Sequence, residues 1–442
     1  MNSGLTQYRM AASPGAQRAK PKVDYIYLAV LLMSFPGYPL VAAFSTITGL
    51  PNTPLSIALR GLNFGLALVL ILAGIASRRE RSSGLLLVAL GVFWLAYTAR
   101  LYFDTLYDPA FLGNAISYYW VWAIGGSLVP MLGLAMKTSR PEQADDYFRW
   151  LYLATFAACF LSMFLATGTV GTEPGMEYES GRMRLEALNP IALGHLGAML
   201  VELSAWALLF HRPWSRGSRR LLLLAGLAIG CYVLLAANSR GPVLAVLACF
   251  LFLLCFVSFR YKFAVMAFLV VGALAIVPLS LYLQETQNIN AFSRLFGQSL
   301  EQHAQQSSRV DLFGSAFEVF LTNPWLGGAL EDPSTRSYPH NVIVEAYMAL
   351  GLFFGSLFVI VLIALCYRTA VLFRRFPQYG WPSLLFIQYL VGAQFSGSLY
   401  GSTFMWCAIG LILSFGTSSA ALVGEAARAR SVYPPRLGRP TW

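Results

Sequence analysis

The segment FAVMAFLVVGALAIVPLSLYL, residues 263–283, contains 21 consecutive residues and no charged side chain. The hydrocarbon core of a bilayer is about 30 Å thick, so a helix needs about 20 apolar residues to cross it. This segment is therefore predicted to be a membrane-spanning helix. The whole composition agrees, because 57% of the 442 residues are hydrophobic and only 12% are charged. A soluble domain carries about 25% charged residues, so the composition excludes a soluble protein.

Applied along the chain, the same criterion predicts about twelve membrane spans and an all-α integral membrane protein. The predicted spans are residues 25–47, 55–76, 84–103, 113–136, 149–167, 189–210, 219–237, 242–259, 262–283, 340–367, 381–397 and 399–423. The resulting division is a tail at 1–24, spans one to nine at 25–283, a large loop at 284–339, spans ten to twelve at 340–423 and a tail at 424–442. The first tail has no convincing cleavage site, so an uncleaved anchor is expected.

The distribution of basic residues predicts the orientation. Of the 31 Lys and Arg residues, 23 lie in the two tails and in one alternate set of connections. The positive-inside rule makes that side cytoplasmic and places both tails there. The large loop then lies on the external side. The net charge of +11 reflects this bias and does not indicate a nucleic-acid partner.

The eight remaining basic residues lie on or near the external face, and every one is an arginine. They are Arg60, Arg100, Arg182, Arg184, Arg240, Arg294, Arg309 and Arg336. A guanidinium stays charged and binds phosphate through two parallel hydrogen bonds, so an all-arginine set favours an anion-binding site. The alternative is that each arginine pairs with an external carboxylate.

One short helix is predicted inside the large loop, in the stretch SSRVDLFGSAFEVFLTNPWLGG. Ser308 followed by Asp311 resembles a helix-capping pair, apolar residues then recur at helical spacing, and Asn323-Pro324 ends the helix. Such a helix is expected to lie at the membrane surface. Arg309 would occupy its first turn, where free N–H groups favour an anion. The alternative is an ion pair of Arg309 with Asp311 or Glu318.

The motif YPHNVIVEAYMALGLFFG follows, where the chain leaves the loop and re-enters the bilayer. Histidine is the side chain best suited to accept a proton near neutral pH, which makes His340 a candidate catalytic base. A capping or packing role is the alternative. Glu345 lies within about one helical turn of His340 and Asn341 and could hold either. Gly351 and Gly355 have the spacing of a close helix–helix contact.

Several reaction classes lack their motifs in this sequence. It contains no Asp-x-Asp pair, P-loop, Gly-x-Ser-x-Gly or His-Glu-x-x-His motif, and its six cysteines all lie in apolar runs without a Cys-x-x-Cys pair. We therefore expect no metal site and no cofactor. His195 and Glu202 are ionisable residues within span six, where they could serve function or form a buried structural pair.

The order of these motifs resembles the O-antigen ligase superfamily, which also contains O-antigen polymerases. In this chain the external arginines before span six come first, and ANSRGP at 237–242 follows. SSR then precedes an interfacial helix that ends in NPWLGG, and PHN with Glu345 and GLFFG comes last. The resemblance covers roughly residues 180–355. It implies an inverting, metal-independent glycosyltransferase of the inner membrane of a Gram-negative bacterium, with a periplasmic active site in and around the large loop.

The resemblance also implies substrates and residue roles. The enzyme would move a glycan from undecaprenyl pyrophosphate to a hydroxyl of the lipid A core oligosaccharide. His340 matches the family's essential histidine, and Asn341 and Glu345 would support it. The donor pyrophosphate would be bound by Arg309, Arg240 and either Arg182 or Arg184, between which the sequence does not choose.

Three alternatives to an O-antigen ligase follow from the same sequence, one of which is a protein O-oligosaccharide ligase of the same superfamily. A polymerase of the superfamily would use the same chemistry with a second lipid-linked glycan as acceptor. A flippase or other transporter of lipid-linked glycans belongs to a different class. Transporters usually place ionisable residues near the membrane midplane and often show internal repeats, whereas the charges of this chain concentrate in external loops.

Overall fold

We describe the protein from a computed structural model. It describes residues 23–77, 84–137, 139, 141–165, 167–168, 183–184, 188–211, 213–287, 289 and 300–415. The C-terminal tail predicted at 424–442 and all but the last two residues of the N-terminal tail lie outside these ranges.

The described residues are almost entirely helical. Up to the middle of the chain the elements are α1 Tyr25–Leu32, η1 Met33–Gly37, α2 Tyr38–Thr48, α3 Asn52–Ala76, α4 Gly84–Tyr107, η2 Pro109–Phe111, α5 Ile116–Trp120, η3 Val121–Leu128, α6 Val129–Met136, α7 Pro141–Leu165, β1 Thr167–Gly168, β2 Met183–Arg184 and α8 Pro190–Phe210. They continue with α9 Ser218–Ala236, α10 Arg240–Phe256, α11 Phe259–Gln287, α13 Leu300–Thr322, α14 Val342–Arg375, η4 Pro377–Tyr379, α15 Trp381–Ser396 and α16 Thr403–Ser414. The strands β1 and β2 pair antiparallel.

The all-α membrane class predicted from the sequence is confirmed. Each predicted span corresponds to one helix or to consecutive helical segments. Within the described residues, nine helices are long and apolar enough to cross a membrane, whereas α10 and α16 are apolar but shorter. The count of twelve spans, the domain boundaries and the external position of the large loop stay predictions. The clearest boundary error is at α7, which begins at Pro141 instead of residue 149.

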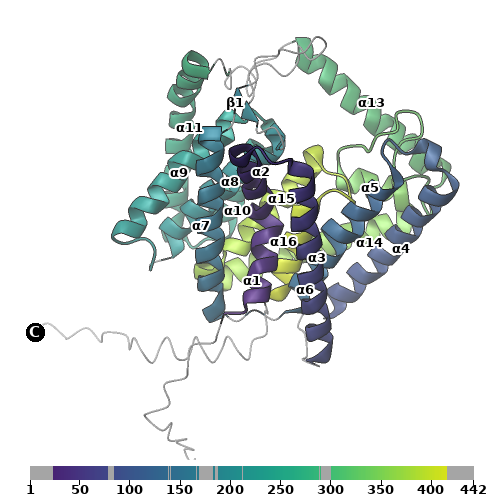
Figure 1. The fold of residues 1–442 in the computed structure, drawn as a ribbon, viewed down its shortest axis with the longest axis horizontal. Helices are drawn as coiled ribbons and strands as arrows, with labels where there is room; N and C mark the ends of the chain where they lie inside the picture. Colours follow the sequence, from purple (N-terminus) through teal and green to yellow (C-terminus); the bar gives the residue numbers. More distant parts are fainter. Residues whose placement is uncertain are drawn as a thin grey trace, which may run out of the picture.

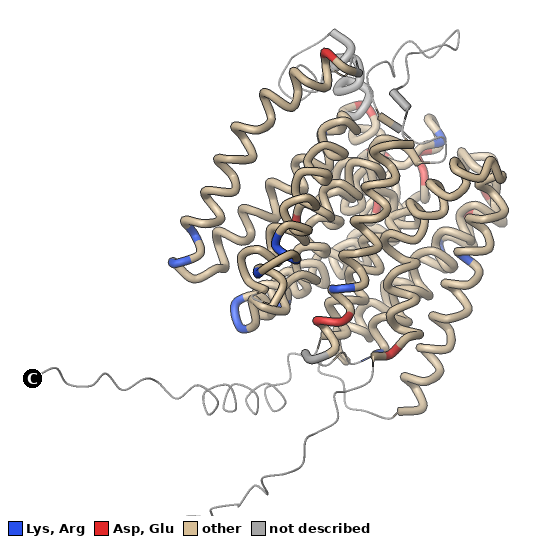
Figure 2. The backbone as a smooth tube through the Cα atoms, turned by 60° about the vertical axis from the view of Figure 1, so that its left-hand side comes forward, with Lys and Arg blue, Asp and Glu red and all other residues tan. Residues whose placement is uncertain are grey.

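The first and last described segments meet at one end of the bundle. Lys137 pairs with Asp24, and the N–H of Ser139 donates a hydrogen bond to the carbonyl of Ser414 at 2.9 Å. This end lies at the bottom of Figure 1, whereas α13 and β1 lie at the top. Most Lys and Arg residues lie in the lower part of the molecule in Figure 2. The described part of the chain therefore concentrates its positive charge at the end where α1 begins.

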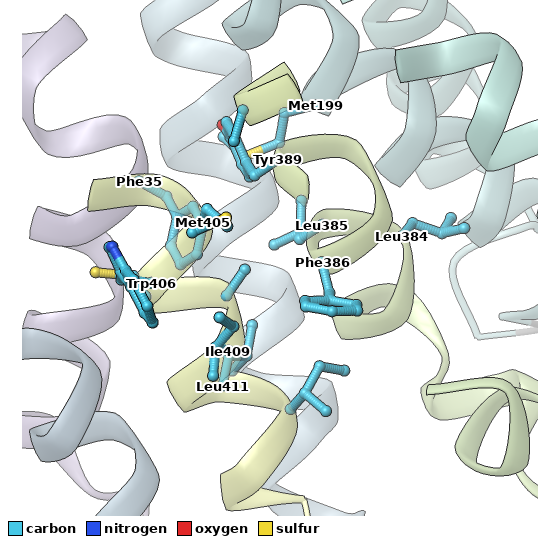
Figure 3. Close-up of a cluster of buried hydrophobic side chains, with 14 of the residues drawn as sticks. Phe35, Met199, Leu384, Leu385, Phe386, Tyr389, Met405, Trp406, Ile409 and Leu411 are labelled. Carbon is cyan, nitrogen blue, oxygen red and sulfur yellow. The ribbon is translucent and has the colours of Figure 1, made fainter. Parts of the chain in front are cut away.

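The helix α8 lies at the centre of the bundle and is buried along nearly all of its length. It packs against α7, α9, α10 and α15. Figure 3 shows the neighbouring core, where α15 and α16 meet α8 and η1. There the ring of Tyr389 lies 5.8 Å from the ring of Phe35 and 5.0 Å from that of Phe404. Inside a bilayer, helices associate through such close packing instead of through the exclusion of water.

The helix α14 is broken at Gly351, which has φ 68° and ψ −166°. This conformation is essentially restricted to glycine. The segment 324–328 fills the break, since the N–H of Leu352 donates to the carbonyl of Pro324 at 2.7 Å and the N–H of Gly328 donates to that of Met348 at 2.8 Å. A Cβ on Gly351 would lie 2.4 Å from the carbonyl carbon of Trp325. Gly351 thus contacts a loop, and the helix–helix contact predicted for this glycine is wrong.

Arg100 of α4 holds the same break together. Its guanidinium donates hydrogen bonds to the carbonyl oxygens of Ala349 at 3.0 Å, Gly327 at 2.6 Å and Gly328 at 3.1 Å, and it pairs with Asp104 at 3.2 Å. Broken helices occur at membrane depth only where other groups satisfy the freed backbone. For Arg100, the alternative to an anion-binding role, an ion pair with a carboxylate, is therefore correct.

The helix α13 runs from Leu300 to Thr322, so it is much longer than the short helix predicted from the sequence. Ser308 does not begin this helix, and Arg309 is its tenth residue instead of lying in its first turn. The argument that free N–H groups beside Arg309 favour an anion is therefore wrong. The local capping pattern was misleading because the helix continues through it into the preceding polar residues. The predicted stop at Asn323-Pro324 is confirmed.

We predict that Gly351→Ala destabilises the protein by about 1–3 kcal/mol, because alanine would have to adopt a backbone conformation reserved for glycine. The measurement is thermal unfolding of the purified protein in detergent. Gly65→Ala on α3 is the matched control, since a Cβ there meets no atom within 4 Å. An equal melting temperature for Gly351→Ala and Gly65→Ala would contradict the prediction.

Candidate functional site

His340 lies two residues before α14, at the end of the chain segment that leads out of α13. Its φ of 55° is positive, which is uncommon for a residue with a side chain and costs free energy that functional sites often carry. Its side chain is partly exposed, and its ring lies 4.4 Å from that of Tyr338. The imidazole thus lies just ahead of the capped start of α14, and its partial exposure leaves it accessible to a ligand.

Asn341 fixes this start in two ways. Its Oδ1 accepts hydrogen bonds from the N–H groups of Ile343 and Val344, both at 3.0 Å. Such a cap typically contributes about 1 kcal/mol to helix stability. Its Nδ2 donates to the carbonyl of Gln394 at 3.2 Å. The residue that follows His340 therefore ties α14 to the end of α15.

Glu345 is fully buried one turn further along α14. Its Oε2 accepts a hydrogen bond from the N–H of Leu399 at 2.8 Å, and its Oε1 accepts one from Tyr97 at 3.4 Å. The carboxylate thus links α14 to α4 and to the connection between α15 and α16. The predicted role of Glu345, to hold His340 and Asn341 in place, stays a prediction. These hydrogen bonds are the contacts through which Glu345 would do so.

Glu331, which the sequence did not single out, is a second buried carboxylate beside the site, with 2% of its surface exposed. Its Oε2 accepts hydrogen bonds from the N–H of Gly113 and from Tyr119, both at 2.8 Å. Its Oε1 accepts one from Tyr400 at 3.0 Å. Glu331 therefore joins three connections of the chain that lie far apart in the sequence. No sequence signal indicated it, because all three donors are neutral groups.

Two tyrosines connect Glu331 to His340. The ring of Tyr400 lies 5.9 Å from that of Tyr338, which in turn packs on His340. Burial is the main reason that the pKa of Tyr338 rises to about 12, and the nearby carboxylates of Glu345 and Glu331 raise it further. The Tyr338 hydroxyl therefore keeps its proton at neutral pH and can donate a hydrogen bond to a ligand.

Arg240 is the first residue of α10, and its side chain is exposed. The segment ANSRGP packs against two helices: a Cβ on Gly241 would lie 3.8 Å from Cβ of Phe395 in α15, and a Cβ on Gly194 in α8 would lie 2.8 Å from Pro242. Because Phe395 follows Gln394, which binds Asn341, the end of α15 brings the His340 region and the Arg240 region together.

The other arginines assigned to the donor are described only in part. Arg309 lies within α13, which packs against α14, and Arg184 lies in β2, opposite Thr167. The structure describes the backbone of both residues but not their side chains. Arg182 lies outside the described residues. The predicted binding of pyrophosphate by these residues therefore stays a prediction.

His195 and Glu202 are both buried in α8, with 8% and 1% of their surfaces exposed. The carbonyl of His195 accepts a hydrogen bond from Nε2 of Gln388 at 2.7 Å, and a Cβ on Gly392 would lie 2.5 Å from the imidazole. These contacts make His195 part of the packing between α8 and α15.

The described residues contain no group of three His, Cys, Asp or Glu side chains that could hold a metal ion.

The fold and this cluster define a helical membrane protein with a histidine, buried carboxylates and an exposed arginine gathered where three helices begin or end. Residues 225–360, under a third of the chain, match the family model described as O-antigen ligase. This part of the chain is therefore similar to the O-antigen ligase family, whose members are glycosyltransferase-like enzymes. The matched region contains Arg240, Arg309, His340 and Glu345. No curated protein matches the chain significantly.

We predict that Glu331→Ala reduces activity and lowers the melting temperature, whereas Glu331→Gln has a smaller effect on both. Alanine leaves one N–H and two hydroxyls without their acceptor, and each buried unsatisfied group costs about 1–3 kcal/mol. The measurements are thermal unfolding and turnover of the purified protein. Glu285→Ala is the matched control, because Glu285 is exposed near the end of α11. Stability and turnover at the wild-type level in Glu331→Ala would contradict the prediction.

Proposed function

We propose that this protein is an O-antigen ligase. It transfers a finished glycan from undecaprenyl pyrophosphate to a hydroxyl of the lipid A core oligosaccharide, with inversion at the anomeric carbon and without a metal ion. The observation that carries the proposal is the position of His340. It stands in a strained conformation at the start of α14, inside the family match and at the end of α15 that also contacts the segment carrying Arg240.

His340 is the general base in this proposal. Its imidazole removes the proton of the acceptor hydroxyl as the oxygen attacks the anomeric carbon from the face opposite the pyrophosphate. A new carbon–oxygen bond forms, and the bond to the pyrophosphate breaks with its electron pair leaving on undecaprenyl pyrophosphate. General-base catalysis contributes about 10²–10⁴-fold to such a step. The cap of Asn341 and the buried carboxylate of Glu345 keep the imidazole in place.

Arginines stabilise the leaving group in this proposal. Negative charge grows on the pyrophosphate as the bond breaks, and preorganised donors aimed at that charge lower the barrier. Arg240 is exposed at the first turn of α10, where the helix dipole also favours an anion. Arg309 and either Arg182 or Arg184 complete the donor site.

The position in the cell follows from the same proposal. The end of the bundle with most Lys and Arg residues faces the cytoplasm, together with both tails, and the His340 end faces the periplasm. The chain spans the inner membrane of a Gram-negative bacterium, and residues 284–339 form the large periplasmic loop. The charge distribution in Figure 2 supports this orientation.

Reconstitution of the reaction tests the proposal and separates the two acceptors. Purified protein in detergent is supplied with an undecaprenyl-pyrophosphate-linked glycan, lipid A core and excess EDTA. Glycan on the lipid A core supports the ligase. Extension of one lipid-linked glycan by another would instead identify a polymerase, and absence of any transfer would refute a glycosyltransferase of either kind. Product formed in detergent, where there is no second compartment, excludes pure transport.

We predict that His340→Ala lowers turnover by about 10²–10⁴-fold and leaves affinity for the donor unchanged, because the pyrophosphate is bound by arginines. The measurements are turnover and donor affinity on one preparation between about pH 5.5 and 8.5, a range that brackets the ordinary pKa of histidine. The wild-type rate should fall as the pH falls, since protonation disables the base, and the variant should lack this decline. A loss of donor affinity in His340→Ala would instead assign His340 to the binding of the pyrophosphate.

We predict that Arg240→Ala and Arg309→Ala each lower turnover by about 10²–10³-fold, the usual effect of removing one donor to a developing anion. Lysine at either position should restore part of the rate, because it keeps the charge but not the two parallel hydrogen bonds. Arg216→Ala is the matched control, since Arg216 is exposed on the connection between α8 and α9. Wild-type turnover in both alanine variants would show that these arginines are structural.

A further inference from the structure

The helix α3 carries a polar stripe that the proposed reaction does not use. Asn52, Ser56, Arg60 and Asn63 follow one another at helical spacing, whereas other positions of α3, such as Ile57 and Leu72, are exposed apolar side chains. Ser56 and Asn63 are buried, and Arg60 is partly buried. Ionisable residues within a membrane span face the protein interior and are functional candidates.

The guanidinium of Arg60 makes cation–π contacts with two aromatic rings. Its guanidinium carbon lies 4.3 Å from the ring centre of Trp122 and 5.2 Å from that of Tyr38. Within the part of the chain that the structure describes, no carboxylate lies within ion-pair distance of Arg60. A cation over aromatic faces is stabilised but keeps its donors for another partner. This differs from Arg100, whose donors are taken by four carbonyl oxygens and a carboxylate.

Both aromatic partners of Arg60 lie at π-helical turns. Trp122 lies within η3, and Tyr38 directly follows η1. The π-helix accounts for well under 1% of residues in proteins and occurs frequently at functional sites. Two such segments on either side of one intramembrane arginine are an observation independent of its charge, and they indicate that the placement of these rings matters for function.

A continuous run of rings leads from Arg60 to His340. The ring of Trp122 lies 5.9 Å from that of Tyr118, which lies 6.1 Å from that of Tyr400. Tyr400 then contacts Tyr338 at 5.9 Å, and Tyr338 contacts His340 at 4.4 Å. Tyr400 is buried, whereas Tyr118 is 41% exposed and Trp122 and Tyr338 are partly exposed. We call the partly exposed set Arg60, Trp122, Tyr118 and Tyr338 the Arg60 strip.

The Arg60 strip has the chemistry of a saccharide site. A sugar ring presents an apolar face of C–H groups that packs on an aromatic ring, and its hydroxyls can bind the Tyr338 hydroxyl. A guanidinium binds phosphate or carboxylate through paired hydrogen bonds. The strip lies on α3, α5, η3 and the segment before α14, whereas Arg240 lies between α8, α10 and α15, so the two regions share no helix.

We propose that the Arg60 strip binds the acceptor saccharide: its rings stack on sugar residues next to the reacting hydroxyl, and Arg60 binds an anionic substituent, phosphate or carboxylate, of that saccharide. The inference rests on the proposed function, because it takes His340 as the point at which acceptor and donor meet. Binding of the acceptor on one side of His340 and of the donor pyrophosphate on the other suits attack from opposite faces of the anomeric carbon.

The test compares KM for the two substrates. Wild type, Arg60→Gln, Arg60→Lys and Trp122→Leu are purified as full chains, and KM is measured for lipid A core and for the undecaprenyl-pyrophosphate-linked glycan. Arg60→Gln should raise KM for the acceptor about ten- to hundredfold, the value of a hydrogen bond to a charged group, and leave KM for the donor unchanged. Arg60→Lys should raise it less, and Trp122→Leu should raise it also for an uncharged acceptor.

Modified acceptors identify the anion. The lipid A core is used as isolated, after phosphatase treatment and after chemical reduction of its carboxyl groups. Wild type and Arg60→Gln should become equal on the acceptor that has lost the group bound by Arg60. Equality after phosphatase treatment assigns phosphate, and equality after reduction assigns carboxylate. A difference that persists on an acceptor lacking both groups would overturn the proposal.

Controls separate binding from folding. Arg260→Gln removes an arginine that lies 4.7 Å from the ring centre of Tyr261 at the other end of the bundle, and Trp150→Leu removes an exposed tryptophan of α7. Neither should change KM for the acceptor. If Arg60→Gln does not fold, the KM of Arg60→Lys for the acceptor is the measurement that tests the proposal. An unchanged acceptor KM, or a raised donor KM, in a folded Arg60 variant would overturn the proposal, whereas a wild type without transfer activity would instead refute the proposed function.

Discussion

The hydrogen bonds that Arg100 donates to the backbone around Gly351 are the interaction on which the site depends. They hold the segment 326–328 against the break in α14 and satisfy the carbonyl oxygen of Ala349, which a continuous helix would have bonded internally. The break separates the first turns of α14 from its long apolar part. His340 therefore stands at the start of a short helical segment whose position is fixed by α4 and a loop, and not by the rest of its own helix.

Buried carboxylates with neutral partners complete this arrangement. Glu331 and Glu345 bind tyrosine hydroxyls and backbone N–H groups of connections that otherwise share no secondary structure. Each carboxyl group accepts more than one hydrogen bond, so it fixes several chain segments at once. The aromatic rings beside His340 owe their positions to these bonds. The site is thus built from connections between helices, while the helices themselves provide the rigid frame.

The sequence predicted the helices well because an apolar run of sufficient length is a direct physical requirement of the bilayer, as residues 263–283 illustrate. It also proposed His340 and Asn341 as site residues; their roles stay predictions, and the structure shows Asn341 as the cap of α14. It was wrong where a local pattern competed with the surroundings: Ser308 looks like a cap, yet α13 continues through it. It missed Glu331, because the partners of this residue are uncharged and distant in the chain. Gly351 was noticed, but its backbone conformation depends on the loop that packs against it.

The bonds of Glu331 and Glu345 also constrain the order in which the molecule can be completed. Leu399 and Tyr400 lie between the last two helices, and a membrane protein emerges from the ribosome from its N-terminus. Domains generally form as the chain is made, yet neither carboxylate can meet these donors until α16 has been synthesised. Residues 225–360, although they contain His340, would emerge with Glu331 and Glu345 each still lacking one hydrogen-bond donor. The segment around His340 would therefore reach its final position only after the connection that carries Leu399 and Tyr400 has been added.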